Sequence, residues 1–286
     1  MISRLVLAHA GASSAGWQAW SLPVLAGAAP VSCYLYGVYR IRRRFGRRWS
    51  MRRTASFVAG CALMAVALTP AMEHFAGQDA RGHMAQHLLL GMFAPLGLVL
   101  GAPVTLLLGA SSLPTRRTVR AALAHRWVRL PTNLAVATAL NAGGLYVLYL
   151  TPLYALSTRS EPVHHLTHLH FLFAGYVFTW AVAGPDPSPA RPRMAWRVAA
   201  LIVAAGAHNF LAKLLYARAA HLPSGTTTLA RSEVEAAAQW MYYGGHFAEL
   251  LVLVVVFASW YRRAPRVRNL SSGPGIRRFP ELATHQ

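Results

Sequence analysis

Long apolar stretches separated by short polar connections dominate the chain. A helix needs about 20 residues to cross a hydrocarbon core of about 30 Å. Seven stretches have roughly this length, at residues 20–40, 54–70, 84–108, 131–151, 164–184, 195–216 and 236–261. The pattern predicts an all-α, polytopic membrane bundle of seven transmembrane helices, which forms a single membrane domain over residues 1–262.

The third stretch contains residues that interrupt helices. Pro95, Gly97, Gly101 and Pro103 all fall within it. Membrane helices tolerate such residues where neighbouring groups satisfy the backbone again. We expect a kink in this stretch, or a helix that ends near Leu100 and is followed by a short second segment.

Composition supports the membrane interpretation. Of 286 residues, 55% are hydrophobic and only 13% are charged, whereas soluble domains carry about 25% charged residues. The two cysteines, Cys33 and Cys61, lie inside apolar stretches. A secreted domain stapled by disulfides is therefore excluded.

The net charge of +20 could indicate nucleic-acid binding. Most of the 28 basic residues, however, lie in alternate connections, at 40–53, 116–129 and 191–197, and in the C-terminal tail. They border the apolar stretches with little aromatic interleaving, so no nucleic-acid partner is expected. The positive-inside rule places the N-terminus outside and the C-terminus in the cytoplasm. The basic tail, 263–286, is rich in Gly, Pro and Ser and is predicted to be disordered.

Most of the 13 histidines fall on the predicted outer side. Two pairs have the i,i+4 spacing that places both rings on one helix face. Single histidines occupy the outer halves of the sixth and seventh stretches. Imidazole suits copper, zinc, iron and nickel, and the thioethers of Met72, Met84 and Met92 would favour Cu(I). The candidate metal ligands are His83, His87, His164, His168, His208 and His246.

Structural interpretations compete with this one. A lone membrane histidine often forms a hydrogen bond between helices, and this interpretation stays open for His208 and His246. His165 and His170 are expected to be structural or interfacial, and Met84 and Met92 fit packing as well as ligation.

A polar stripe on the last stretch is expected to face the interior of the bundle. Gln239, Tyr242, His246 and Glu249 recur every three or four residues along an otherwise apolar helix. Glu249 is the only acidic residue inside a predicted span. It could be a ligand or a proton relay, but its preferred role is to hold His246 in one tautomer.

Two motifs carry a family resemblance. One is His83-Met84-Ala85-Gln86-His87-Leu88-Leu89-Leu90, followed by Ala94-Pro95 and Gly101-Ala102-Pro103. The other is His164-His165-Leu166-Thr167-His168-Leu169-His170-Phe171, followed by Gly175, Phe178, Trp180 and Gly184-Pro185-Asp186-Pro187. Both are similar to signatures of the CtaG-type cytochrome c oxidase assembly factors. The resemblance extends from the first stretch to the seventh.

The resemblance implies a multi-pass protein of the bacterial plasma membrane that matures haem–copper oxidases by handling copper. It implies no enzymatic reaction. The expected partners are the lipid bilayer, cytochrome c oxidase subunits and an extracytoplasmic copper chaperone. The family's histidines carry over to His83, His87, His168 and either His164 or His165.

Other functions stay open. The family is related to membrane copper-resistance proteins, which keeps copper uptake among the candidates. The histidines could also be axial ligands of a b-type haem. An intramembrane zinc hydrolase would need three strong ligands and an acid or base. The chain has no HExxH motif, and Glu249 is the one carboxylate available inside a span.

Overall fold

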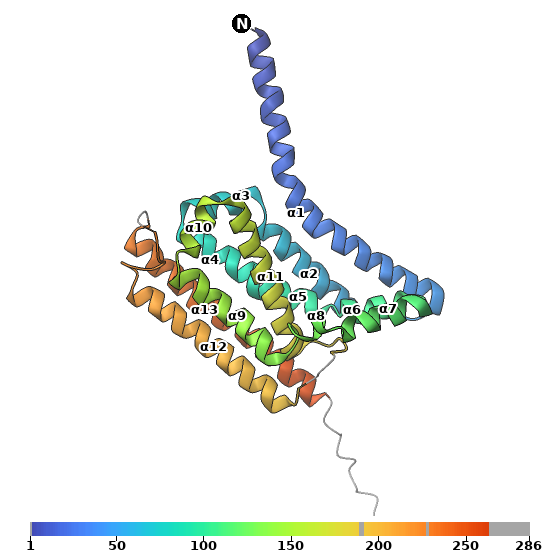
Figure 1. Ribbon diagram of the computed structural model, residues 1–286. Coiled ribbons are helices and arrows are strands. Elements are labelled where there is room, and N and C mark those ends of the chain that lie inside the picture. Colours follow the sequence, from blue (N-terminus) through green and yellow to red (C-terminus); the bar gives the residue numbers. More distant parts are fainter. Residues whose placement is uncertain (1, 189–191, 227–228, 263–286) are drawn as a thin grey trace, which may run out of the picture.

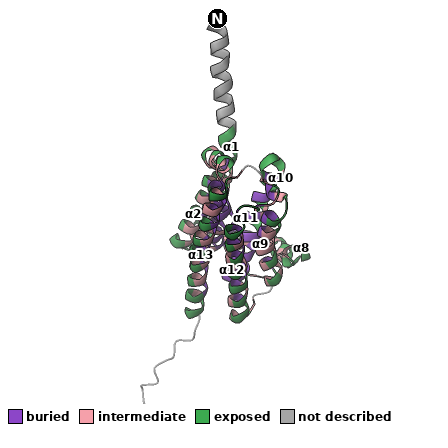
Figure 2. Ribbon diagram, turned by 90° about the vertical axis from the view of Figure 1, so that its left-hand side faces the viewer, coloured by how far each residue is buried: buried purple, intermediate pink, exposed green. Residues whose placement is uncertain are grey.

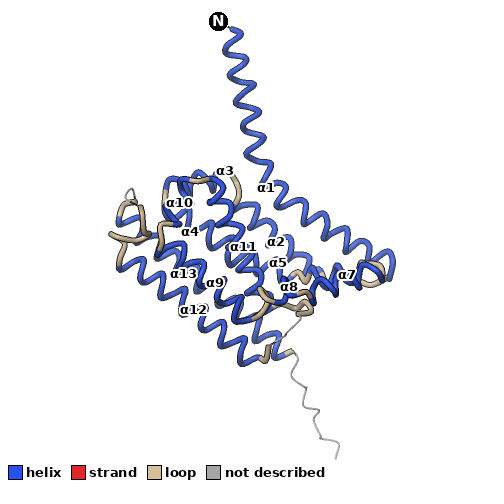
Figure 3. Tube along the Cα trace, viewed as in Figure 1, coloured by secondary structure: helices blue, strands red, loops and turns tan. Residues whose placement is uncertain are grey.

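The computed structural model describes residues 2–188, 192–226 and 229–262, with side chains from residue 19 onward. Every regular element in these ranges is a helix (Figure 3), so the expectation of an all-α fold is confirmed for the described chain. The predicted disordered tail, 263–286, lies outside the described residues.

Fourteen helical elements follow one another along the described chain (Figure 1). In order they are α1 (Ile2–Phe45), α2 (Met51–Ala67), α3 (Pro70–Gln78), α4 (Ala80–Leu88), the π-helix η1 (Leu89–Phe93), α5 (Ala94–Leu100), α6 (Pro103–Ala110), α7 (Leu113–Ala124), α8 (Arg126–Arg129), α9 (Leu134–Leu150), α10 (Leu153–Arg159), α11 (Glu161–Ala183), α12 (Met194–Ala217) and α13 (Arg231–Tyr261).

Between five and seven of these segments can cross a membrane. The five segments long and apolar enough to do so directly are Ala19–Phe45, Ala80–Ala110, Glu161–Ala183, Met194–Ala217 and Arg231–Tyr261. The predicted spans 54–70 and 131–151 correspond to bent pairs. The chain turns by 53° between α2 and α3 and by 79° between α9 and α10. Pro70 and Pro152 stand at these bends, where proline interrupts the helical hydrogen bonds. The protein is therefore multi-pass, and it has seven spans if each bent pair crosses once.

The bundle has two chemically different ends. We call the end where α3 and α10 lie (Figure 1) the histidine end, because α4 and α11 begin there with their histidine pairs. We call the opposite end, where α5 passes into α6 and where α11 finishes, the arginine end. Buried residues line the middle of the bundle (Figure 2), while residues 19–45 of α1 pack along one side and stay largely exposed.

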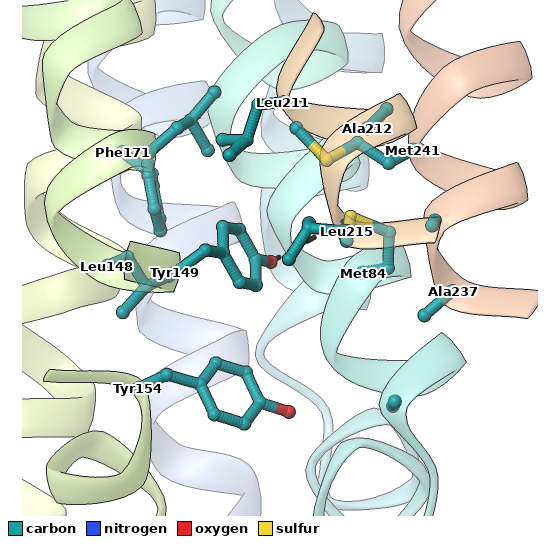
Figure 4. Packing of buried hydrophobic residues seen from close by; sticks show 13 residues of the cluster. Met84, Leu148, Tyr149, Tyr154, Phe171, Leu211, Ala212, Leu215, Ala237 and Met241 are labelled. Carbon is teal, nitrogen blue, oxygen red and sulfur yellow. Dashed lines mark hydrogen bonds between the residues drawn. The ribbon is translucent and has the colours of Figure 1, made fainter. Parts of the chain in front are cut away.

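One of the four buried apolar clusters lies toward the histidine end. Tyr149, Leu211 and Met241 are almost fully buried in it (Figure 4). The Tyr149 hydroxyl donates a hydrogen bond to the Met84 thioether, with 3.9 Å between Oη and Sδ. Met84 is thus engaged in packing, as its structural interpretation expected.

Small residues let α2 and α5 approach closely. A Cβ added at Gly60 would lie 2.6 Å from the Leu98 nitrogen, and one at Gly97 would lie 2.7 Å from the Gly60 Cα. The Ser56 hydroxyl donates to the Gly97 carbonyl at 3.0 Å. Membrane helices associate through packing of this kind because lipid is as apolar as their side chains. Gly60 and Gly97 have low helix propensity, but here their lack of a side chain allows the close contact between α2 and α5.

The expected irregularity of the third span is confirmed. Pro95 cannot donate a hydrogen bond to the Gly91 carbonyl, and the chain passes through the π-helix η1 just before it. α5 ends at Leu100, Ala102 adopts a left-handed conformation with φ of 53°, and α6 follows from Pro103. The Gly91 carbonyl meets Gly175 of α11 so closely that a Cβ at Gly175 would overlap it.

A buried carboxylate organises the arginine end. Asp186 is only 2% exposed and accepts hydrogen bonds from the Val104 nitrogen at 3.1 Å and the Thr105 nitrogen at 2.8 Å. It thereby caps the first turn of α6, where amide groups lack partners within the helix. The buried Arg197 donates to the Val182 carbonyl at 2.5 Å. These two buried charged groups therefore find hydrogen-bond partners within the fold.

Candidate metal centre

Three side chains at the histidine end form a compact group of ligand atoms. Glu73 of α3 and His164 and His168 of α11 each offer one atom, and these atoms lie within 4.8 Å of one another. His164 Nε2 is 2.9 Å from Glu73 Oε2, and the His164 and His168 ring centroids are 4.1 Å apart. We call this group the outer site. Within the described residues it is the one group of at least three histidine, cysteine or acidic side chains with this spacing.

Local sequence explains how the outer site forms. His164 and His168 are one helical turn apart near the start of α11, so their rings lie on one face and meet edge to face. Thr69 is the N-cap of α3 and accepts a hydrogen bond from the Met72 nitrogen, and Pro70 starts the helix in a new direction. Gly82 lets the backbone of α3 lie directly on α4, because a Cβ there would overlap Phe75. These contacts hold Glu73 beside the imidazoles.

The first predicted pair, His83 and His87, is buried on α4, with 4% of each residue exposed. The His83 ring packs edge-on against Tyr154 at 4.8 Å between centroids, and the His87 ring packs against Phe171 at 4.6 Å. Gln86, between them, anchors α4 by donating to the Ala67 carbonyl at 2.9 Å. The shared face expected from the spacing is buried, but neither ring belongs to the outer site.

His208 of α12 is also buried, with 5% exposed. Its ring lies next to that of His87, with 6.2 Å between centroids and 26° between planes. His208 Nδ1 is 3.7 Å from Glu249 Oε1. Glu249 was expected to orient His246, but the histidine nitrogen found within 4 Å of its carboxylate is His208 Nδ1.

His246 differs from the other predicted ligands because it is exposed on the outside of the bundle. Its Nδ1 lies 2.7 Å from the Tyr242 carbonyl and its Nε2 lies 3.3 Å from Asn209 Nδ2. Gln239 is exposed as well. The expectation that this polar stripe faces the interior is therefore wrong for Gln239 and His246. α13 packs instead through the face that carries Met241, Gly245 and Ala248.

The remaining histidines of α11 lie off the face of the outer site. The side chain of His165 is 48% exposed and its Nε2 is 3.7 Å from Glu161 Oε1. His170 packs over Gly144 of α9, where a Cβ would overlap its ring. Both arrangements agree with the structural or interfacial role expected for these two residues.

The sequence interpretation did not include Glu73. One signal could have found it, because the chain has only 8 acidic residues and Glu73 lies beside His74, ten residues before the first histidine pair. Spacing alone does not reveal that α3 bends back over α11.

Space near the histidines limits what can bind. The cavity beside His87 and His208 has a volume of about 30 Å³. Pockets for drug-sized ligands and organic cofactors have about 300–1,000 Å³. An ion or a water molecule fits here, but a haem macrocycle does not.

Comparison with known proteins agrees with the resemblance noted in the sequence. Residues 32–263 match the profile of the cytochrome c oxidase caa3 assembly factors. Uncharacterized proteins of Mycobacterium leprae and Mycobacterium bovis are each 30% identical over 87% of the chain. A third such protein, of Mycobacterium tuberculosis, has the same identity and coverage. The chain spans about 40% of the length of these relatives. No solved structure matches it.

Proposed function

The chain belongs to the cytochrome c oxidase caa3 assembly factor family, and from this premise we propose that it carries copper for the assembly of a haem–copper oxidase. Copper is the cargo, bound at the outer site as Cu(I) and passed on by ligand exchange. We propose no covalent reaction. The supply of copper by an extracytoplasmic chaperone and its delivery to oxidase subunits are parts of the same proposal.

The outer site is the observation that carries the proposal. Two imidazoles and a carboxylate form a donor set that can hold a first-row transition metal. His168 strengthens the case, because both of its ring nitrogens are buried and lack a hydrogen-bond partner in the described chain. A buried polar atom without a partner costs about 1–3 kcal/mol. A bound metal ion would supply the missing interaction.

The exposure of the outer site fits a cargo rather than a structural metal. The side chains of His164 and Glu73 are 19% and 34% exposed, whereas His168 is buried. A donor can therefore approach from the surface while one ligand stays fixed in the bundle. With the N-terminus outside, as the arginine distribution predicts, this opening faces away from the cytoplasm of a bacterial plasma membrane.

Metal analysis of the purified full chain tests the proposal. Wild type is loaded anaerobically with Cu(I), and its retention of copper and of zinc is compared with that of Glu73→Gln/His168→Phe. The double variant should lose one equivalent of copper and should fail to restore oxidase activity in a strain that lacks the gene. The matched control is His165→Phe, three residues from His168 and largely exposed, which should behave as wild type.

Three results would contradict the proposal. Wild type that retains no copper removes the cargo, and a preference for zinc over copper favours the hydrolase alternative. Full oxidase activity in the double variant would show that oxidase assembly does not require copper at the outer site. If the wild-type gene is needed for oxidase activity only when copper is scarce in the medium, this result would instead support copper uptake.

A further inference from the structure

A second pair of imidazoles lies deeper in the bundle than the outer site. His87 is one turn farther along α4 than His83, which corresponds to about 6 Å, and its ring lies beside that of His208. All four ring nitrogens of His87 and His208 are buried and have no hydrogen-bond partner in the described chain. Both residues are more than nine-tenths buried. Two adjacent rings with unmet hydrogen bonds are a costly arrangement unless something else binds them.

Soft and hard donors line the space beside this pair. The cavity of about 30 Å³ is bordered by His87, His208, Met92 and Glu249. A site needs roughly 10–15 Å³ to hold one water molecule, so a single ion has room. Imidazole and thioether together are a donor set that selects Cu(I). Glu249 Oε1 lies 3.7 Å from His208 Nδ1, just beyond hydrogen-bond distance. A small shift would let this carboxylate orient the ring, as carboxylates do for metal-binding histidines.

The fold makes room for each of these donors. The π-helix η1 begins two residues after His87 and contains Met92. π-bulges within α-helices are frequent at functional sites. Across the bundle, Gly245 of α13 leaves space for His208, because a Cβ at that position would overlap the imidazole. The bulge thus contributes Met92 to the cavity lining, and Gly245 makes room for the His208 ring that lines the same cavity.

We propose that His87, His208 and Met92 form a second Cu(I) site, the inner site, to which copper moves from the outer site. This inference rests on the proposed function. His83 is suited to relay the ion, because it lies on α4 between the histidine end and His87 and its Nε2 is buried without a partner. Cu(I) exchanges the imidazoles and the Glu73 carboxylate of the outer site for imidazole and thioether ligands without a change of oxidation state, so no oxidant or reductant is required.

Titration of the full-length protein with Cu(I), against a chromophoric chelator and without oxygen, tests the inner site. Wild type should bind two equivalents. His87→Phe/His208→Phe and Glu73→Gln/His164→Phe should each bind one, because each removes a different site. Met92→Leu conserves volume and keeps the fold. It should weaken the second equivalent about tenfold and remove the sulfur contribution from the X-ray absorption spectrum of the bound copper.

The matched control is His170→Phe. His170 also has a buried nitrogen without a partner, but it packs over Gly144 rather than against the cavity, so this variant should bind two equivalents. The inner site is overturned if wild type binds only one equivalent of copper, if the Glu73/His164 variant loses it and if the His87/His208 variant keeps it. That result would leave the proposed function intact. An unchanged spectrum in Met92→Leu contradicts Met92 as a ligand. Wild type without copper overturns both proposals.

Discussion

The two ends of the bundle treat their buried polar groups in opposite ways. At the arginine end, Asp186 caps α6 and Arg197 donates to a carbonyl of α11. At the histidine end and just below it, His87, His168 and His208 are equally buried, but their ring nitrogens have no partners in the described chain. Satisfied groups hold a fold together, whereas unsatisfied groups have binding capacity left for a ligand. Substitutions at the two ends should therefore have opposite consequences.

The largest loss of stability is expected from Asp186→Ala. It leaves two amide groups and the Thr105 hydroxyl without their acceptor. Each buried donor left without a partner costs about 1–3 kcal/mol, so the loss of an acceptor for three donors should lower the free energy of unfolding by at least about 3 kcal/mol. Thermal unfolding in detergent measures the change. Asp186→Asn keeps one acceptor oxygen and should lose less, and the folded fraction of both variants should bind copper as wild type does.

A smaller loss of stability is expected from a substitution at Gly175, which lies in α11 between the two ends of the bundle. In Gly175→Ala the new Cβ meets the Gly91 carbonyl, which cannot move far because it belongs to the helix backbone. Overpacking of this kind costs about 1–3 kcal/mol. Gly143→Ala is the control, because nothing lies within 4 Å of a Cβ at that position. Equal melting temperatures for the two variants would show that the contact is looser than described.

Little or no loss of stability is expected from His168→Phe. Replacing a buried polar group that has no partner by an apolar group of similar shape is nearly neutral or stabilising. The free energy of unfolding of the metal-free protein should change by less than about 1 kcal/mol, while one equivalent of copper is lost. A destabilisation as large as that of Asp186→Ala would mean that the ring is satisfied in the fold, and the contrast between the two ends would fail.

The smallest effect on copper binding is expected from His246→Phe. His246 is exposed and has two polar neighbours. Hydrogen bonds between membrane helices contribute about 0.6 kcal/mol on average. Stability should fall by about that amount, and copper stoichiometry should not change. Loss of copper in this variant would bring back His246 as a ligand and would require α12 and α13 to rearrange.

Much of the fold follows from apolar length and from the helix breakers. Residues 164–184 and 195–216 each form a helix close to the predicted bounds, and the breakers of the third span act where they were expected. The side on which a helix packs is harder to read. α13 is apolar on several sides, so its polar stripe and its glycine face compete for the interior, and the glycine face packs inward.

The site was predictable only in part, for a similar reason. Spacing within one helix identified His164 with His168 and His83 with His87. The partners that complete a site come from other helices, as Glu73 and His208 do, and their approach depends on the bend at Pro70 and on Gly245. These are tertiary contacts, and one sequence read by periodicity does not contain them.

The π-helix before Pro95 has a consequence for the phase of the third span. A π-turn takes in one residue more than an α-turn, and one residue corresponds to about 100° of rotation. The segment before η1 can therefore turn His83 and His87 toward one set of neighbours, while the segment after it turns Gly97 toward α2. Removing one residue at Leu89 would restore a regular helix and rotate the two faces against each other. In an unbroken helix, the angle between the histidine face and the Gly97 face would be fixed by the helix geometry. The bulge changes this angle, so one span can pack against two different sets of neighbours.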